Sequence, residues 1–448
     1  MKIVIAGAGE VGCHLAKMLT GNYHDVTIID DREEKLAQLR ETMDVVTVTG
    51  YPTSVETLAA AGTADADLFV AVNPAKDQSV NIICAVMAKK LGARKVTARI
   101  NNDEYLRSEN KILFTEMGID LMFYPEKIAA DEIFGLLRQG GMSDFIDFAH
   151  GRLQMVAIRL NEGAPLVDKT LLDYVSEVKP QFRMVALTRD GETLIPQKDT
   201  IFKQGDLLFV IAKKESIPEI MAYTGQDELD IKRLTILGGG SIGELLARQF
   251  ESSAEFVKII EKDRDRCDYL SEKLDRTLVI NGDGRDADLL DEEDIRSCDA
   301  FVAVTPSSET NILACVAARG MGVARTIAEV ENIEYIKLAE AMGVDAVVNK
   351  KLITAGRIFR FTLSNKVRTV KVLGGSDAEV LEYVVNPSSP ITKAPLRDLH
   401  FPKDAVIGGV IRGSEAIIAV GDTQIRPYDR VAVFAMPSAL KQIEKFFS

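Results

Sequence analysis

The sequence predicts an α/β protein with two doubly wound parallel-sheet domains, each followed by a small α+β domain. A glycine fingerprint, Gly7-Ala8-Gly9-Glu10-Val11-Gly12, recurs as Gly238-Gly239-Gly240-Ser241-Ile242-Gly243. An acid stands eighteen positions beyond the last glycine of each copy, at Asp30 and at Glu261. Short apolar runs alternate with helix-like segments around both copies, which is typical of a parallel sheet covered on both faces. One fingerprint is a weak signal, but two with the same downstream acid indicate an internal duplication.

The first half has the strand and helix pattern of a six-stranded Rossmann unit. The expected strands are the apolar runs Ile3–Ala6, Val26–Ile29, Val45–Val48, Leu68–Val72, Val96–Ile100 and Leu121–Phe123. The expected helices are Gly12–Leu19, Glu33–Glu41, Ser79–Lys90 and Ala129–Gln139. The pattern returns around 232–350 at an offset near 230, where Asn81-Ile82 reads as Asn311-Ile312 and Glu104-Tyr105 as Glu334-Tyr335.

The composition changes after each of these Rossmann-like halves. Glycine pairs at Gly140-Gly141 and Gly374-Gly375 indicate hinges or linkers. Alternating strand-like runs follow each pair, and Thr188-Arg189-Asp190-Gly191-Glu192 is a hairpin signal. The expected domains are therefore a Rossmann domain at 1–140, a small α+β domain at 141–228, a Rossmann domain at 229–372 and a small α+β domain at 373–448.

The composition is that of a soluble globular protein, with 46% apolar and 27% charged residues. No stretch of about 18 uncharged apolar residues exists, so we expect no membrane-spanning helix, and we expect no signal peptide. The five cysteines form no CxxC pair, which favours reduced thiols of a cytoplasmic protein over disulfides or a metal site. The net charge of −13 argues against binding to nucleic acid, so a phosphate ligand needs backbone amides or a few placed arginines.

The two fingerprints predict two nucleotide-binding crevices. Gly7 permits a tight turn, Gly9 lets a pyrophosphate approach the backbone, and Gly12 lets the helix pack closely on the sheet. Phosphates then bind the unpaired N–H groups of the helix N-terminus, and Asp30 accepts hydrogen bonds from ribose hydroxyls. The predicted contacts are Gly7, Ala8, Gly9, Glu10, Val11, Gly12 and Asp30 in the first crevice, and Gly238, Gly240, Ser241, Ile242, Gly243 and Glu261 in the second. The alternatives are a first turn that only maintains the fold and a second copy kept for packing.

The charge at the end of the fifth strand differs between the halves. Arg99 corresponds to Glu329 (329 − 99 = 230). Because the carboxyl ends of parallel strands face the ligand crevice, Arg99 favours a terminal phosphate there and Glu329 repels one. We therefore expect the first crevice to accept a polyphosphate such as ATP better than the second does. The alternative for Arg99 is a solvated or ion-paired arginine.

Three further polar residues follow predicted strands. Asp283, after the third strand of the second half, can accept a hydrogen bond from an adenine amino group or can cap a turn. Asn73 and Thr305, after the fourth strands, can contact ribose or can cap helices.

No catalytic constellation and no metal site are expected. The chain has four histidines, and it contains no HExxH, GxSxG or GxxxxGK[ST] motif and no Tyr-xxx-Lys pair after a fourth strand. A dehydrogenase needs an acid–base group near its nicotinamide, and no duplicated candidate exists. Binding without turnover is the simpler interpretation. The alternative is a soluble NAD-dependent oxidoreductase with duplicated Rossmann domains.

The tandem order resembles the TrkA family, the peripheral cytoplasmic subunits of bacterial Trk-type potassium uptake systems. The likeness covers essentially the whole chain. One departure is Tyr51-Pro52, where many relatives that consist of a single unit have an acid after the glycine. The matching elements are Lys2–Gly12 with Asp30, Gly238–Gly243 with Glu261, Asn281-Gly282-Asp283-Gly284, and the segments around Tyr105 and Tyr335.

This resemblance implies a regulatory role. Each half would be a regulator-of-potassium-conductance (RCK) unit whose Rossmann crevice binds NAD(H) and ATP or ADP. Such subunits form a ring, here a homotetramer of eight units, and attach to the inner face of the membrane through an integral potassium-translocating subunit that they gate. A third interpretation is a nucleotide-sensing regulator of another transporter or enzyme, with a separate effector bound to the small domains near Asn161–Leu172.

Overall fold

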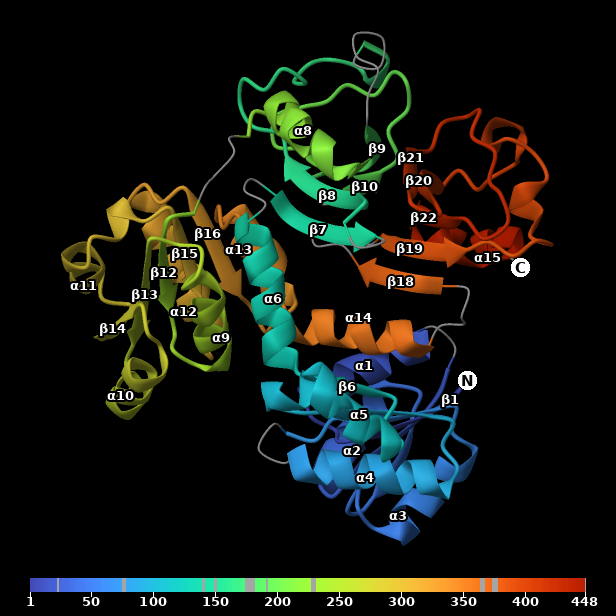
Figure 1. Ribbon diagram of the computed structural model, residues 1–448, viewed down its shortest axis with the longest axis vertical. Coiled ribbons are helices and arrows are strands. Elements are labelled where there is room, and N and C mark those ends of the chain that lie inside the picture. The colour runs from blue at the N-terminus through green and yellow to red at the C-terminus, as the bar shows by residue number, and fades with distance from the viewer. Residues whose placement is uncertain are drawn as a thin grey trace. The chain divides into compact units, whose positions relative to one another are not determined.

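Two parallel and two antiparallel sheets make up the computed structural model of the chain (Figure 1). It describes residues 1–21, 24–74, 78–138, 142–148, 151–173, 182–190, 192–226, 231–362, 367–372 and 378–447. Contacts divide the chain into a first unit, Met1–Ala130 with Asn349–Thr362, and a second unit, Asp131–Val348 with Leu363–Ser448. The domain boundaries given above stay predictions. The hinge candidates Gly140-Gly141 and Gly374-Gly375 lie outside the described residues.

The first unit contains a six-stranded parallel sheet with the strand order β3-β2-β1-β4-β5-β6. The strands are β1 (Lys2–Ala6), β2 (Asp25–Asp30), β3 (Val46–Thr49), β4 (Leu68–Ala71), β5 (Lys95–Arg99) and β6 (Leu121–Phe123). This order confirms the predicted Rossmann sheet, and its direction reverses between β1 and β4, where such sheets bind ligands. The continuous apolar runs located every strand to within one residue at each end.

Helices connect the strands of this sheet. They are α1 (Glu10–Gly21), α2 (Glu33–Thr42), α3 (Val55–Ala60), α4 (Gln78–Leu91), α5 (Ser108–Glu116) and α6 (Pro125–Arg138). The helix after the first fingerprint, α1, buries Leu15, Ala16 and Leu19, which recur at the spacing of one helix face. Burial of this face fixes the N-terminus of α1 beside the fingerprint.

The second unit repeats the sheet in the order β14-β13-β12-β15-β16-β17. Its strands are β12 (Arg233–Leu237), β13 (Phe256–Glu261), β14 (Thr277–Asn281), β15 (Ala300–Ala303), β16 (Arg325–Glu329) and β17 (Ala346–Val348). The helices that follow them are α9 (Ser241–Phe250), α10 (Arg264–Lys273), α11 (Ala287–Glu292), α12 (Ser308–Gly320), α13 (Glu334–Ala341) and α14 (Lys350–Thr362). The predicted duplication of the Rossmann sheet is thus confirmed.

The helix after the last strand of each sheet crosses to the other unit. Helix α14 follows β17 directly but belongs to the first unit, where it packs along α1 (orange and blue in Figure 1). Ala355 and Ile358 of α14 are fully buried. Helix α6 follows β6, and its second part belongs to the second unit. There Phe134 packs edge-on against Phe250 of α9, with ring centroids 4.9 Å apart. Both exchanged segments thus pack on a fingerprint helix, α14 on α1 and the second part of α6 on α9.

The remaining two sheets are antiparallel and have matching strand orders, β7-β8-β11-β9-β10 and β18-β19-β22-β20-β21. The first small module contains β7 (Met142–Phe148), β8 (Leu153–Arg159), β9 (Phe182–Arg189), β10 (Glu192–Leu194), β11 (Leu207–Ala212) and α8 (Ile217–Thr224). The second contains β18 (Val367–Val372), β19 (Glu379–Val384), β20 (Ala405–Arg412), β21 (Glu415–Ile418), β22 (Arg430–Ala435) and α15 (Leu440–Phe447). The pairing of β9 with β10 confirms the predicted hairpin.

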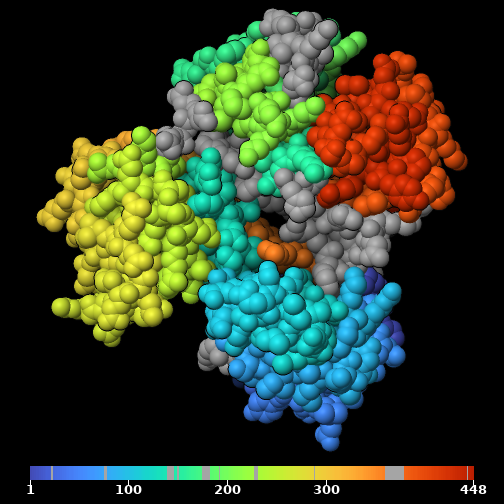
Figure 2. Space-filling model, viewed as in Figure 1, coloured from blue at the N-terminus to red at the C-terminus, as the bar shows by residue number. Residues whose placement is uncertain are grey.

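The two small modules share one apolar core within the second unit, and Figure 2 shows the green first module directly against the red second module. The rings of Phe209 and Phe434 lie 6.0 Å apart across the contact. A Cβ on Gly408 would lie 2.1 Å from the Ile211 Cδ1 atom. Glycine at this position in β20 therefore permits the close approach of the sheets.

The described part of the chain has no helix with the length and apolar character needed to cross a bilayer. All five cysteines are free of disulfides, and four of them are buried.

Replacing Gly408 with valine is expected to lower the free energy of unfolding of the second unit by about 1–3 kcal/mol, because overpacking displaces Ile211. Scanning calorimetry of the full chain would record a lower transition temperature. Gly320→Ala is the control, because a Cβ there meets nothing within 4 Å. An unchanged transition in the Gly408 variant would contradict the close packing of the modules.

Candidate functional site

The first glycine fingerprint forms a tight turn between β1 and α1. Gly7 has a φ of 115°, and a Cβ on it would lie 2.8 Å from the Asn73 nitrogen. A Cβ on Gly12 would lie 2.0 Å from the Gly7 carbonyl oxygen, whereas one on Gly9 would meet nothing within 4 Å. Packing therefore requires glycine at Gly7 and Gly12, while Gly9 leaves open space beside the helix N-terminus.

The second fingerprint repeats this geometry between β12 and α9. Gly238 has a φ of 107°, and a Cβ on Gly243 would lie 2.1 Å from the Gly238 carbonyl oxygen. A Cβ on Gly240 would meet nothing within 4 Å, as at Gly9. Among the other predicted contacts, the buried residues are Ala8, Val11 and Ile242, and the exposed ones are Glu10 and Ser241. Both turns thus have the shape that the fingerprint predicts.

Asp30 and Glu261 join the second strand to the fingerprint in both halves. Asp30 Oδ2 accepts from the Ala8 N–H at 2.7 Å, and Glu261 Oε2 accepts from the Gly239 N–H at 2.7 Å. Asp30 also accepts from the Arg32 guanidinium at 2.7 and 2.8 Å. Burial alone would raise the pKa of Asp30, but the bonds from Arg32 and the Ala8 amide hold it below its ordinary value. Ribose binding by Asp30 stays a prediction, and a ribose would compete with Arg32.

Two buried asparagines hold the ends of the fourth and fifth strands together. Asn81 Oδ1 accepts from the Asn73 N–H at 2.8 Å, and Asn81 Nδ2 donates to the carbonyl of the last residue of β5 at 3.2 Å. Asn311 forms the equivalent bonds with Thr305 and with the last residue of β16, at 2.9 and 2.8 Å. In the sequence these asparagines are markers of the repeat, without a predicted role of their own. The sequence feature that could have identified them is a polar residue at the same position of an otherwise apolar helix in both halves.

Arg99 lies at the first crevice, as its place at the end of β5 predicts. It lines a cavity of about 330 Å³ together with Gly9, Glu10 and Val11 of the fingerprint. Its guanidinium donates to Glu126 Oε1 at 3.0 Å. Arg99 is therefore ion-paired, as the alternative interpretation had it, and also faces the cavity.

Three lysines that the sequence analysis missed line the same cavity. Lys35 belongs to α2, and Lys350 and Lys351 begin α14. The Lys351 Nζ atom lies 3.0 Å from Glu10 Oε2. No local pattern pointed to the α14 pair, because this helix follows a strand of the other half.

The second crevice has a different set of charges. Arg266 of α10 donates to the Gly239 carbonyl at 2.6 Å, so its guanidinium lies on the fingerprint turn. Glu329 is buried at the end of β16. Asp283 accepts from the Arg285 backbone N–H at 3.1 Å and from its Nε at 3.0 Å, and these bonds lower the pKa of Asp283 to about 2. Asp283 therefore caps a turn, and its contact with a base stays a prediction.

The cavity of the first crevice contains no histidine and no cysteine among its lining residues. His14 of α1 is half-buried, and its burial and the nearby Lys17 and Lys351 lower its pKa. Burial raises the pKa of Cys84 to about 12, which leaves its thiol protonated at neutral pH. Over the described ranges, no three His, Cys, Asp or Glu side chains are grouped to hold a metal ion.

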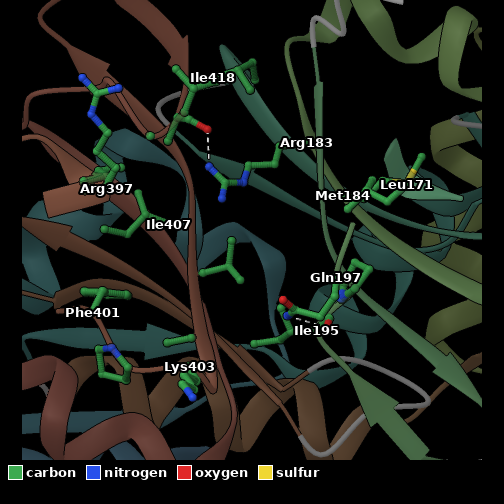
Figure 3. A pocket seen from close by; sticks show the side chains of 18 of the residues that line it. Leu171, Arg183, Met184, Ile195, Gln197, Arg397, Phe401, Lys403, Ile407 and Ile418 are labelled. Carbon is green, nitrogen blue, oxygen red and sulfur yellow. Dashed lines mark hydrogen bonds between the residues drawn. The ribbon is translucent and has the colours of Figure 1, made fainter. Parts of the chain in front are cut away.

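A larger cavity, of about 1150 Å³, lies between the two small modules of the second unit (Figure 3). Among the described residues, its lining is mainly apolar and includes no acidic side chain; the cationic ones there are Arg183, Arg397 and Lys403. Arg183 reaches toward the second module and donates to the Ala419 carbonyl, and burial lowers its pKa. Leu171, from the predicted effector segment Asn161–Leu172, lines the cavity. Effector binding stays a prediction.

The Asp30→Asn variant is expected to be less stable by about 1–3 kcal/mol at pH 7, because it loses a charged acceptor for Arg32 and the Ala8 amide. Since folding lowers the pKa of Asp30, its contribution is complete above about pH 4 and is lost as the pH falls further. Urea unfolding of both proteins from pH 7 to pH 3 measures the difference. A difference that is constant over this range would contradict the assignment.

Known sequences match the chain in both of its repeats. The TrkA-N domain model matches residues 3–125 and 234–350, and the TrkA-C domain model matches residues 155–225 and 380–448. Two full-length relatives are a "Trk system potassium uptake protein TrkA homolog" of Archaeoglobus fulgidus and a "Trk system potassium uptake protein TrkA" of Haemophilus influenzae. The first is 35% identical over 100% of both chains, and the second is 33% identical over 100% of this chain and 98% of the relative.

Solved structures agree with this fold. A structure of the "GsuK channel bound to NAD" covers 100% of this chain with a TM-score of 0.62, and this chain covers 78% of it. The "GsuK RCK domain" covers 100% of this chain, also with a TM-score of 0.62, and 94% of it is covered. Their identities of 17% and 18% support the fold alone. With TrkA-N and TrkA-C domains in tandem and relatives matching over its whole length, the chain belongs to the TrkA family.

Proposed function

We propose that this protein is the nucleotide-binding regulatory subunit of a Trk-type potassium uptake system. Its two Rossmann crevices bind NAD(H) and ATP or ADP, and the bound nucleotide sets the activity of a membrane-embedded potassium translocator. The protein works at the inner face of the membrane, to which the translocator attaches it. It binds rather than converts its nucleotides.

The fingerprint geometry carries this proposal. Each turn presents the N-terminus of a buried helix, an open position at its second glycine, and an acid bonded to the turn. Backbone N–H groups and the helix dipole attract phosphate at such a point. The first crevice adds Arg99 and three lysines to this potential, which is the local positive charge that an acidic chain needs.

The names of the relatives support the transport role. Those at 35% and 33% identity are called Trk system potassium uptake proteins, and the match extends over the whole chain. Two GsuK structures that cover 100% and 81% of this chain are described as bound to NAD and to ADP. The family resemblance implies the same two ligand classes for the crevices of this chain.

Self-association into a ring is supported by apolar residues exposed at the same places in both halves. Leu113 and Met117 at the end of α5 are exposed, and so are Leu338 and Met342 at the end of α13, each shifted by 225 positions (338 − 113 and 342 − 117). Exposed apolar patches on soluble proteins mark association sites. We infer a homotetramer in which eight Rossmann units form the ring.

Gating in such a ring is a shift between two arrangements. A nucleotide can change the population of the arrangements only by binding one more tightly than the other, and a tenfold difference corresponds to about 1.4 kcal/mol. The crevices therefore need groups whose positions differ between the arrangements.

The alternative, an NAD-dependent oxidoreductase, finds less support. Its hydride transfer needs an acid–base group beside the nicotinamide. The first cavity offers lysines and a glutamate in ion pairs, and the second crevice offers Arg266 on the fingerprint itself. Oxidation of NADH or reduction of NAD by the purified protein in the presence of a small substrate would favour this alternative.

Calorimetric titration of the full chain with ATP, ADP, NAD and NADH tests the binding. Gly12→Val is expected to remove binding at the first crevice and Gly243→Val at the second, because each side chain would strike the carbonyl of the first fingerprint glycine. Each variant should lose about one nucleotide per chain relative to the parent. The variants control for each other, since the untouched crevice reports whether the chain is folded.

Binding of none of the four nucleotides by the parent protein would overturn the proposed function. Unchanged binding in one of the two variants would show that its crevice is a packing copy. Circular dichroism spectra of the variants, matched to the parent, exclude loss of fold as the cause.

The double variant Leu113→Asp, Leu338→Asp is expected to lose ring assembly, because a carboxylate on each matched apolar face opposes its burial. Size-exclusion chromatography with light scattering should show a mass below that of the parent. Val55→Asp is the control. Val55 is an exposed apolar residue at the start of α3, but the corresponding residue at the start of α11 is Ala287, so Val55 is not part of an apolar face repeated in both halves. An unchanged mass in the double variant would contradict the assembly face.

A further inference from the structure

Helix α14 is a part of the second half that completes the first crevice. Its apolar face, with Ala355 and Ile358, is buried in the first unit, where the helix packs along α1. Its first turn is fixed by Asn349, whose Oδ1 accepts from the Leu352 N–H at 2.8 Å. The residues between these two anchors, Lys350 and Lys351, therefore have a defined place.

Both lysines reach the cavity beside the fingerprint. They line the same 330 Å³ as Gly9 and Arg99, and their side chains are only 19% and 15% exposed. The Lys351 Nζ atom lies 3.0 Å from Glu10 Oε2, and the Lys350 Nζ atom lies 3.9 Å from Glu126 Oε1. Two helix-borne ammonium groups thus converge on the place where a phosphate would lie.

Two glutamate side chains are the partners of these cations. Glu126 Oε1 accepts from Arg99 at 3.0 Å and lies near Lys350, while Glu10 pairs with Lys351. Both the Nε of Arg99 and the second oxygen of Glu126 are buried without a hydrogen-bond partner. The Arg99 guanidinium therefore has a hydrogen-bond donor that its pairing with Glu126 does not use.

The helix start that corresponds to Lys350 and Lys351 carries no lysine. Helices α6 and α14 both begin two residues past the end of their strands, so Lys350 and Lys351 correspond to Pro125 and Glu126. Glu126 itself pairs with Arg99 in the first crevice, and Arg99 corresponds to Glu329. The α14 lysines and Arg99 thus have no basic counterpart at the equivalent positions of the repeat.

We propose that Lys350 and Lys351 bind the terminal phosphates of a nucleoside triphosphate in the first crevice, so that the site is complete only when α14 of the second half is docked. This rests on the proposed function of the crevice as a nucleotide site. Without a nucleotide, Glu10 and Glu126 are the ion-pair partners of the lysines and Arg99. The terminal phosphates of the triphosphate take over these cations and displace the two glutamates. The lysines are specificity-determining residues that distinguish ATP from a dinucleotide, whose pyrophosphate is bound by the fingerprint amides.

The test is calorimetry of the full chain with ATP, ADP and NADH. The variant Lys350→Gln, Lys351→Gln keeps side-chain length and is expected to weaken ATP about ten- to hundredfold, ADP less, and NADH about twofold or less. Lys350→Arg, Lys351→Arg should restore ATP binding. Lys337→Gln, an exposed lysine of α13, is the matched control and should change nothing.

A second variant tests the competing carboxylate. Glu126→Gln removes one anion from the cavity and is expected to strengthen ATP about threefold or more with NADH unchanged. Weaker ATP in this variant would contradict the displacement.

The outcomes separate this proposal from the proposed function. If the parent binds both nucleotides and the lysine variant loses ATP and NADH equally, α14 acts only through packing and the proposal is overturned. If ATP binds the lysine variant as it binds the parent, while Arg99→Ala weakens it, the lysines have no role but the crevice is a nucleotide site. If the parent binds neither nucleotide, the proposed function itself fails.

Discussion

The packing of α14 against α1 is the interaction on which the first crevice depends. A helix with an apolar face must bury it, and α14 buries Ala355 and Ile358 in the unit of the other half. Because the helix is rigid, this burial also determines where its first turn lies. Lys350 and Lys351 stand one turn ahead of the buried face and therefore reach the rim of the fingerprint. The charge of the crevice is in this way a consequence of apolar burial some distance from it.

The two halves have the same or similar side chains where these bond backbone groups, and they differ in side chains at the crevice that do not. Asn81 and Asn311 form the same bonds, and Asp30 and Glu261 accept from the same amide of the fingerprint. Buried backbone groups need partners, so these side chains have little freedom to change. Arg99 pairs with the Glu126 side chain, and its counterpart Glu329 has the opposite charge, so one fold has two different crevices.

The sequence was sufficient for what depends on local pattern. Each strand of the first sheet was predicted because its apolar run is continuous, and Arg99 was placed because strand ends meet at one edge of a parallel sheet. The α14 lysines could not be predicted, because helical periodicity shows that a face is buried but not which surface covers it. The bond between Asp30 and Arg32 was missed for a related reason, since a side chain two residues away competes with any ligand for the carboxylate.

The proposed exchange of ion pairs at this crevice would make it a switch rather than a simple binding site. While α14 is docked, Lys350 and Lys351 each have a glutamate partner, so the charges of these two lysines are already paired. In the proposed binding mode, a triphosphate replaces these partners, whereas a dinucleotide leaves them in place. Thermodynamic linkage is reciprocal. If docking of α14 raises the affinity for ATP by some factor, then bound ATP raises the equilibrium constant for docking of α14 by the same factor. At a factor of ten this is about 1.4 kcal/mol, enough to change the population of a balanced pair of states substantially. In the same binding mode NADH gains nothing from the lysines and supplies no such bias, so the crevice is expected to respond differently to the two nucleotides.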